Sequence, residues 1–365
     1  MAERLAVRDV AARDLDACAR LLAGRHRRDR ARLPILPAAF DQPGECAGVL
    51  GELLADEAAS GAVAERGGEV VGFMFGRRAL HAPDHWLAQY FPPRSIGIPI
   101  HGHAAAEGVD TLETYRGLYG HLAGRWVDGG FFTHRADFLA SDEVQRDVWF
   151  QLGFGAVTTY AGRDAAPLDS AVALGEGIEV RRGTVEDLAE VERLESVNGR
   201  FHHGSPVFWP YLWEDVRASA SGLSKYALGT ERHAIFLATR GAPRTGGTET
   251  LGMQMLFAGM AFGPRLVTPE GWAYLFHGVV DPERRGGGVG TALLERSLDW
   301  ARANSHGSDR DAGIPGGGIT LHYATMNPLA GPFWGARGFE PIAYSAERTV
   351  DRRVAWARPR GSSEG

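Results

Sequence analysis

The chain has 365 residues, of which 44% are hydrophobic and 23% are charged, as in a soluble globular protein of two ordinary domains. A net charge of −6 argues against nucleic acid as the main ligand, and no apolar run is long enough to span a membrane. The two cysteines form no metal-binding pattern and the N-terminus has no apolar signal core. We therefore expect a cytoplasmic protein without a bound metal or a membrane partner.

The two halves of the chain carry the same succession of segments. Each half opens with a short predicted strand and an acidic helix start, the strands lying at 6–9 and 179–182. A predicted β-hairpin follows in each, over 62–75 and 234–257. Such a repeat indicates two copies of one α/β unit.

The expected boundaries follow from this repeat. The first unit is predicted over 1–161 and the second over 178–357. The linker between them, 162–177, is rich in Ala, Asp and Gly, which is typical of a connecting segment.

An aromatic stretch lies early in the second half, from Ser196 to Trp213. It contains Phe201, His202, Trp209 and other aromatic residues. It either lines a pocket for an apolar or aromatic amine or packs as a helix between the two units. Its two adjacent histidines have no third ligand in view, so they do not predict a metal site.

The most informative segment is a strand, a glycine turn and a helix. Leu275–Val280 is an apolar run of strand length, and Pro282 ends it. The turn Arg284–Gly290 contains four glycines, and apolar residues at helical spacing follow it. Glycines let successive backbone N–H groups converge on one point, where the next helix adds its N-terminal donors. The segment therefore predicts an anion-binding site.

The spacing of the turn narrows the choice of anion. A Walker loop requires a lysine, and this turn has none. A dinucleotide-binding fingerprint has its glycines directly after the strand, whereas the segment Pro282–Arg285 intervenes here. The pattern Arg-x-x-Gly-x-Gly is filled by Arg285, Gly288 and Gly290. This pattern resembles the coenzyme A loop of the GNAT acetyltransferase superfamily.

A second motif strengthens the resemblance. A predicted strand over 319–325 is followed by a segment in which five positions match the family pattern Asn-x-x-Ala-x-x-aromatic with a later Gly-Phe pair. These positions are Asn327, Ala330, Phe333, Gly338 and Phe339. Two motifs in the right order are more specific than one glycine turn.

The resemblance implies a fold, a reaction and a cofactor site. It implies an α/β (α+β) fold of two tandem units, each a mixed, mostly antiparallel twisted sheet flanked by helices. It also implies transfer of an acetyl group from acetyl-CoA to a primary amine of a small molecule or peptide. The implied cofactor-binding residues are Val279, Val280, Arg285, Gly286, Gly287, Gly288, Val289, Gly290, Thr291, Asn327 and Phe333.

The catalytic groups are less clear, because Trp334 stands where the family often has a proton-donating tyrosine. The candidates are Tyr274, His277 and Tyr323, each with an alternative role as a structural strand residue. Regular strand alternation predicts Tyr274 and Phe276 on one face and His277 on the other, unless a bulge at Gly278 changes it.

The first unit lacks both the arginine and the clustered glycines of the turn, and Asp142 replaces the asparagine at the position of Asn327. We therefore expect it to bind coenzyme A poorly or not at all and to have a structural role or form a wall of the acceptor cleft. Two other readings stay open: a non-catalytic acyl-CoA sensor or scaffold, and a nucleotide or phosphate site. A homodimer also stays open.

Overall fold

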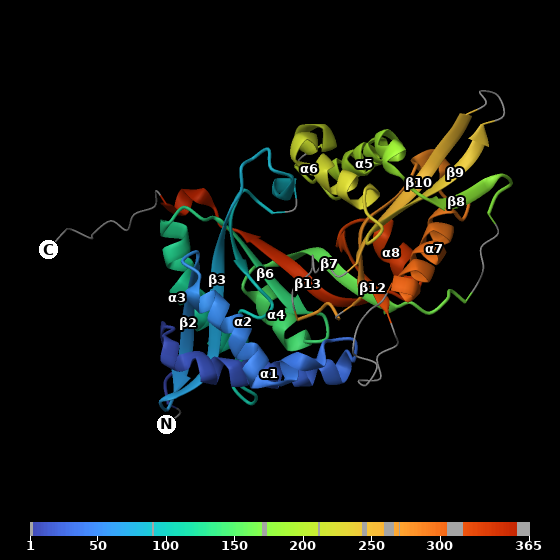
Figure 1. Cartoon of the computed structure of the whole chain (residues 1–365). Coiled ribbons are helices and arrows are strands. Elements are labelled where there is room, and N and C mark those ends of the chain that lie inside the picture. The colour runs from blue at the N-terminus through green and yellow to red at the C-terminus, as the bar shows by residue number, and fades with distance from the viewer. Residues whose placement is uncertain are drawn as a thin grey trace.

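The computed structural model describes residues 3–89, 91–169, 174–210, 212–242, 247–258, 266–269, 271–304 and 317–355. Within these residues, thirteen strands form one sheet that runs through the whole molecule (Figure 1). Its order is β1-β2-β3-β4-β6-β13-β7-β12-β11-β10-β9-β8, with β5 beside β3. Among the described helices, none combines the length and the apolar character that crossing a bilayer requires.

The elements of the first half are as follows. They are β1 (Ala6–Asp9), α1 (Leu15–Arg32), α2 (Pro43–Ala55), β2 (Ala59–Arg66), β3 (Glu69–Leu80), β4 (Arg94–Ile98), β5 (His103–Ala105), α3 (Thr111–Asp128), β6 (Thr133–Leu139), α4 (Glu143–Gln151) and β7 (Gly155–Asp164).

The second half repeats this succession. Its elements are β8 (Ile178–Arg182), α5 (Leu188–His203), α6 (Trp213–Leu228), β9 (Ala234–Ala242), β10 (Gly247–Ala258), β11 (Ala273–Val280), α7 (Val289–Asn304), β12 (Gly318–Ala324), α8 (Ala330–Gly335) and β13 (Glu340–Thr349).

The same ion pair fixes the start of both halves. Arg8 in β1 donates two hydrogen bonds to Asp14, at 2.7 and 2.8 Å, and Arg181 in β8 does the same to Asp187, at 2.8 and 2.7 Å. Each aspartate also accepts the backbone N–H of the residue three positions before it, which fixes the turn into α1 or α5. The repeat seen in the sequence is therefore a repeat of local structure.

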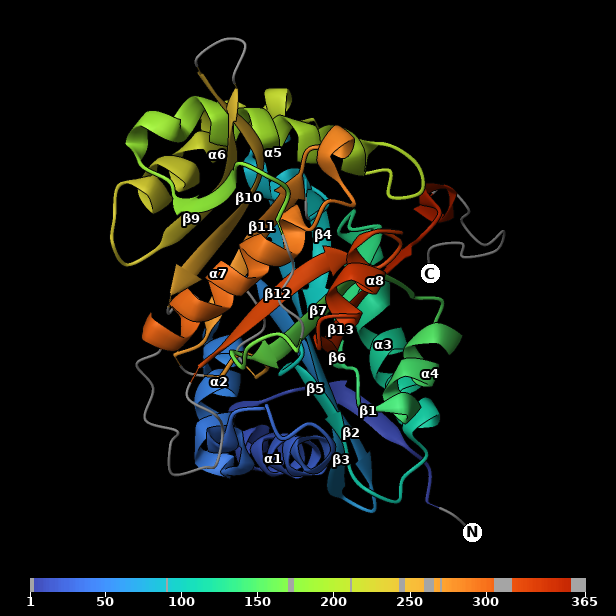
Figure 2. The ribbon, with the colours of Figure 1, turned by 90° about the vertical axis from the view of Figure 1, so that its right-hand side faces the viewer.

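Each half has helices on both faces of its sheet (Figure 2). In the second half, α5 and α6 bury Val191, Leu194 and Ala227 against one face, together with Phe276 of β11. The opposite face carries α7, whose Leu293, Leu294 and Leu298 form another core with Leu275 of β11. The first half has the corresponding arrangement of α1 and α2 opposite α3. The predicted fold class is confirmed.

The last strand of each half pairs only with the other half in the described residues. β7 of the first half lies between β12 and β13 and is antiparallel to both. β13, the last strand of the second half, lies between β6 and β7. The two halves therefore exchange their final strands at the centre of the sheet.

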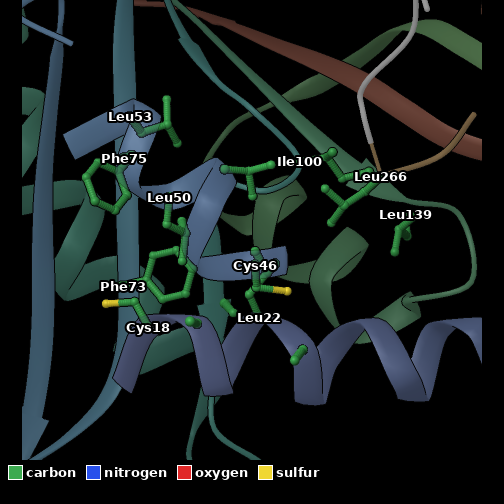
Figure 3. Packing of buried hydrophobic residues seen from close by; sticks show 14 of the residues in the cluster. Cys18, Leu22, Cys46, Leu50, Leu53, Phe73, Phe75, Ile100, Leu139 and Leu266 are labelled. Atoms are coloured by element: carbon green, nitrogen blue, oxygen red, sulfur yellow. The ribbon is translucent and has the colours of Figure 1, made fainter. Parts of the chain in front are cut away.

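A further segment of the second half enters the core of the first. Leu266 and Val267, in the connection between β10 and β11, are buried among residues of α1, α2 and β3. Figure 3 shows Leu266 beside Ile100 and Leu139, in the same core as the free thiols of Cys18 and Cys46. The two halves share one packed interior.

The division of the chain into units over 1–161 and 178–357 remains a prediction. Its first boundary falls inside β7, and residues 170–173 of the expected linker and 356–357 at the end lie outside the described residues.

Candidate acyl-donor and acceptor site

The candidate site opens where two neighbouring parallel strands separate. β11 and β12 pair only from Ala273 to Leu275 with Ile319 to Leu321. After Leu275, β11 continues to Val280 along β10 alone, so its other edge faces a cavity. A cavity between diverging strands offers unpaired backbone groups to an extended ligand.

A glycine turn and a helix N-terminus close one end of this cavity. Gly286 and Gly288 adopt φ values of 82° and 79°, a conformation that side-chain-bearing residues rarely adopt. The turn leads directly into α7, whose first N–H groups have no acceptor within the helix. A Cβ placed on Gly286 would meet no atom within 4 Å, so a ligand can approach the backbone there. The turn therefore has the backbone geometry expected of an anion-binding site.

Two arginines add positive charge at this end. Arg285 lies at the rim, where it donates to the carbonyl of Val280 at 3.2 Å. Arg337, just after α8, donates to the hydroxyl of Thr291 at 3.1 and 2.6 Å and to the carbonyl of Phe333. Its guanidinium also lies 3.8 Å from the ring centre of Phe333. Arg337 therefore ties α8 to the start of α7 while facing the cavity.

Asn327 fixes the opposite wall. Its side-chain oxygen accepts the backbone N–H groups of Leu329 and Ala330, at 2.9 and 3.1 Å, which shapes the turn into α8. Its amide nitrogen donates to Nε2 of His202 at 3.3 Å. The residue thus connects the second motif to the aromatic stretch of α5.

The cavity has a volume of about 570 Å³. Most of the predicted site residues line it: Val279, Val280, Arg285, Gly286, Gly288, Val289, Gly290, Thr291, Asn327 and Phe333 for the cofactor, and His277 and Tyr323 for catalysis. Gly287 and Tyr274 are not among the described lining residues. Within the described residues, no group of three His, Cys, Asp or Glu side chains could hold a metal ion.

A buried carboxylate holds one of the catalytic candidates. Nδ1 of His277 lies 3.2 Å from Oε1 of Glu195, a residue of α5 that is only 4% exposed. Ser224 of α6 donates to the same carboxylate oxygen at 2.9 Å. Because Glu195 engages Nδ1, the ring orientation of His277 is fixed and the histidine faces the cavity.

The direction of His277 differs from the prediction. Leu256 of β10 pairs with Leu275 and Met255 pairs with His277, so Phe276 has no opposite residue and forms a bulge. The bulge turns His277 to the α5 side, the side of Phe276, so the predicted alternation is wrong. The bulge lies two residues before Gly278, the position at which the sequence analysis allowed for one.

Tyr274 supports a second histidine. Its hydroxyl lies 2.6 Å from Nδ1 of His322 in β12, and the two rings are stacked with an interplanar angle of 9°. Burial, reinforced by the nearby His277, lowers the pKa of His322 to about 3, so its imidazole is neutral at pH 7. Tyr274 therefore does not face the cavity itself but supports His322, which does.

Tyr323 lies on the wall near α8 and is half-buried. Burial raises the pKa of its phenol, which keeps the hydroxyl protonated at neutral pH. Trp334 also lines the cavity and packs on Phe333 and Phe339, with ring centres 4.8 and 5.1 Å apart. Tyr344 packs on Phe138 in the first half and is not among the described lining residues.

The aromatic stretch forms the remaining wall. His202 and Trp209 are stacked, with ring centres 4.6 Å apart and an interplanar angle of 21°, and both line the cavity with Phe201. Burial lowers the pKa of His202 to about 4. Of the two expectations for this stretch, pocket lining therefore holds for these three residues. Tyr211 lies outside the described residues.

Comparison with known proteins places this site in a family. A family model described as the acetyltransferase (GNAT) family matches residues 210–311, which include β11, the glycine turn and α7. This part of the second half is thus similar to the GNAT family, and the matched residues carry one end of the cavity. The GNAT fold supports acyl transfer in general and typically binds acetyl-CoA.

Two solved structures are similar to this chain. A GCN5-related N-acetyltransferase from Sphaerobacter thermophilus is 16% identical over 94% of this chain and 95% of that chain, with a TM-score of 0.51. A tandem GNAT protein from the clavulanic acid biosynthesis pathway is 17% identical over 95% and 99%, with a TM-score of 0.49. No curated protein matches the chain significantly.

The corresponding place in the first half is built differently in the residues that the structure describes. The N-terminus of α3 is capped by its own carboxylate, because Asp110 accepts the N–H of Glu113 at 2.9 Å. The space beside β5 is filled by His103, Tyr115 and Trp149, whose ring centres lie 5.4 to 5.6 Å apart and whose side chains are fully buried. All described lining residues of the cavity come from the second half.

Three residues of the site were not identified by the sequence analysis. Glu195 and Arg337 were not considered, and His322 was given no role. A local signal existed for Glu195, because it shares the buried face of α5 with Val191 at helical spacing, where a carboxylate needs a partner. The other two have no local signal, because the fold alone brings them to the cavity.

Proposed function

We propose that the protein transfers an acetyl group from acetyl-CoA to a primary amine of a small molecule or peptide. One observation carries the proposal: a single cavity joins an anion-binding turn at one end to a carboxylate-supported histidine at the other. A phosphate-binding site alone does not need a buried Glu195–His277 pair.

The cavity residues fit coenzyme A by their chemistry. The N–H groups from Gly286 to Gly290, with Arg285 and Arg337, would hold the pyrophosphate, while the N–H of Thr291 donates to the carbonyl of Gly288 at 3.0 Å. The exposed edge of Val279 and Val280 would pair with the pantetheine arm as an added strand does, and Asn327 and Phe333 would flank it. The open space at Gly286 is where such a group approaches the backbone.

The proposed reaction needs a base for the amine and an acid for the leaving thiolate. His277 would take the proton from the attacking amine, with Glu195 orienting the imidazole. Tyr323, protonated at neutral pH, would supply a proton to the departing thiolate, a role that Trp334 cannot fill because its indole only donates a hydrogen bond. A cytoplasmic location and a homodimer remain predictions.

The proposal is tested by calorimetric titration of acetyl-CoA into the parent protein and two matched glycine variants. Gly290→Leu places its side chain against Phe333, whose ring lies 3.1 Å from the position of a Cβ, and we expect it to lower affinity at least tenfold. Gly335→Leu, in α8, meets no atom within 4 Å and should bind as the parent does. Absence of binding to the folded parent would refute the proposal.

Two further measurements separate the alternatives. Thiol release in the presence of amines separates a transferase from a non-catalytic acyl-CoA sensor, which would bind without turnover. If ATP or NAD competes with acetyl-CoA for binding, the glycine turn would instead belong to a nucleotide-binding site.

A further inference from the structure

The acceptor end of the cavity differs in character from the donor end, and the inference drawn from it rests on the proposed function. Around His277, four lining residues carry planar rings: His202, Trp209, Phe276 and His322. They come from α5, the segment before α6, β11 and β12. Phe201 also lines the cavity, but its ring lies against Arg285 at the donor end, with the guanidinium 5.2 Å from the ring centre.

These rings are ordered in stacked pairs. His202 is stacked on Trp209, as described above, and Phe276 is stacked on His277 with ring centres 4.4 Å apart and an interplanar angle of 26°. His322 is stacked on Tyr274 behind the wall. Asn327 and the carbonyl of Asn198 hold both ring nitrogens of His202. The faces of the wall are therefore preorganised, which favours a flat ligand.

The charges of the lining residues restrict the ligand further. Among the described lining residues, the charged side chains are Arg284, Arg285 and Arg337, and none carries a carboxylate. The imidazoles of His202 and His322 are neutral at pH 7 because burial lowers the pKa of each. The carboxylate of Glu195 lies behind His277 and is engaged by it and by Ser224.

A ligand with several ammonium groups would have to desolvate charges here without a carboxylate partner, which is costly. An amine with one basic nitrogen needs only the Glu195–His277 pair to lose its proton. The remainder of that amine would lie against aromatic faces, where ring–ring contacts add about 0.5–1.5 kcal/mol beyond area burial.

We propose that the acceptor is a small monoamine whose single primary amino group is attached to a flat aromatic group, as in an arylalkylamine. In the reaction the amine nitrogen forms a bond to the thioester carbonyl carbon, and the carbon–sulfur bond breaks. His277 receives the proton from nitrogen and Tyr323 protonates the thiolate, so the products are an N-acetyl amide and the free thiol of coenzyme A.

The test measures thiol release from acetyl-CoA with four amines at equal concentration. 2-Phenylethylamine represents the proposed class, n-butylamine lacks the ring, and spermidine and kanamycin carry several ammonium groups. We expect kcat/KM for phenylethylamine to exceed that for each of the others at least tenfold. Equal or faster turnover of spermidine, kanamycin or butylamine would overturn the inference.

Matched variants connect the preference to the wall. Trp209→Ala should raise the KM for phenylethylamine at least fivefold and leave the KM for acetyl-CoA unchanged. Trp209→Leu keeps apolar volume without the flat ring and should raise the same KM. It replaces Trp209→Ala if that variant does not fold. Phe208→Ala changes a neighbouring side chain that is 68% exposed and is not among the described lining residues, so it should change neither constant. An unchanged KM for phenylethylamine in both folded Trp209 variants would contradict the proposed wall.

The outcomes separate this inference from the proposed function. If acetyl-CoA binds but no arylalkylamine is acetylated, or if other amines are preferred, the acceptor class is wrong and the donor site stands. If acetyl-CoA does not bind and no amine releases thiol, the proposed function is wrong, and the inference fails with it.

Discussion

Glu195 is the residue on which the proposed chemistry depends most, although it does not line the cavity. It lies in α5 and reaches His277 of β11 across the core of the second half. A buried carboxylate without a partner is strongly unfavourable, so its contacts with His277 and Ser224 also stabilise the packing of α5 on the sheet.

The Glu195→Gln variant separates these two roles. Glutamine keeps the shape but removes the carboxylate that lies beside Nδ1 of His277. We expect kcat to fall about tenfold to a hundredfold, within the contribution typical of general base catalysis, while the KM for acetyl-CoA stays unchanged. Steady-state kinetics with a productive amine measure both constants. Glu190→Gln, which alters an exposed ion pair on the same helix, should leave both unchanged, and an unaltered kcat in Glu195→Gln would remove Glu195 from the mechanism.

At the scale of residues, the sequence predicted motifs made of neighbouring residues and missed contacts between residues that are far apart in the chain. The glycine turn and the segment from Asn327 to Phe333 are local motifs whose backbone shape follows from their own residues. The direction of His277 depends on a bulge opposite β10, and its partner Glu195 lies 82 positions away. Neither feature leaves a pattern within β11 itself.

At the scale of elements, the exchange of β7 and β13 explains how the halves hold together. Each strand finds its hydrogen-bonding partners in the other half, and Leu266 adds a buried side chain from the second half to the first core. The repeat predicted the opening strand and the hairpin of each unit. It could not predict which copy a final strand would join, because equivalent edges in two similar units differ little in hydrophobic pattern.

The contribution of the Leu266 contact can be measured by Leu266→Ala. The side chain is fully buried, so we expect a loss of about 2–5 kcal/mol in the free energy of unfolding, as for other buried leucines. Urea denaturation should show one transition by both tryptophan fluorescence and circular dichroism, shifted to lower urea. Leu80→Ala, at a position 62% exposed, serves as control and should change stability by less than about 0.5 kcal/mol. Two separate transitions, with only one of them shifted, would show that the halves unfold independently.

At the scale of the whole molecule, neutral buried histidines are spread over both halves. Burial lowers the pKa of His134 to about 4, of His202 to about 4 and of His322 to about 3. The unfolded chain therefore takes up these protons before the folded protein does. Stability is complete above pH 6.5 and is lost as the pH falls towards 4. Asp29 acts in the opposite direction, because burial raises the pKa of its carboxyl to about 6.

We therefore expect the protein to be acid-sensitive. Each of the three histidines contributes up to about 1.4 kcal/mol per pH unit below 6.5, and Asp29 offsets part of this effect. Urea denaturation at pH 7.5 and pH 5.0 should show a decrease of several kcal/mol in the free energy of unfolding. A stability that is equal or greater at pH 5.0 would mean that these imidazoles are accessible to protons in the folded state.

The place of β13 also has a consequence for synthesis. A ribosome makes β6 about 200 residues before it makes β13, the strand that completes the pairing of β6. During that interval the nascent first half presents an open strand edge, which is a template for association with other chains. A message cut short before β13 would therefore produce a chain defective in its first half, although every residue of that half had been translated.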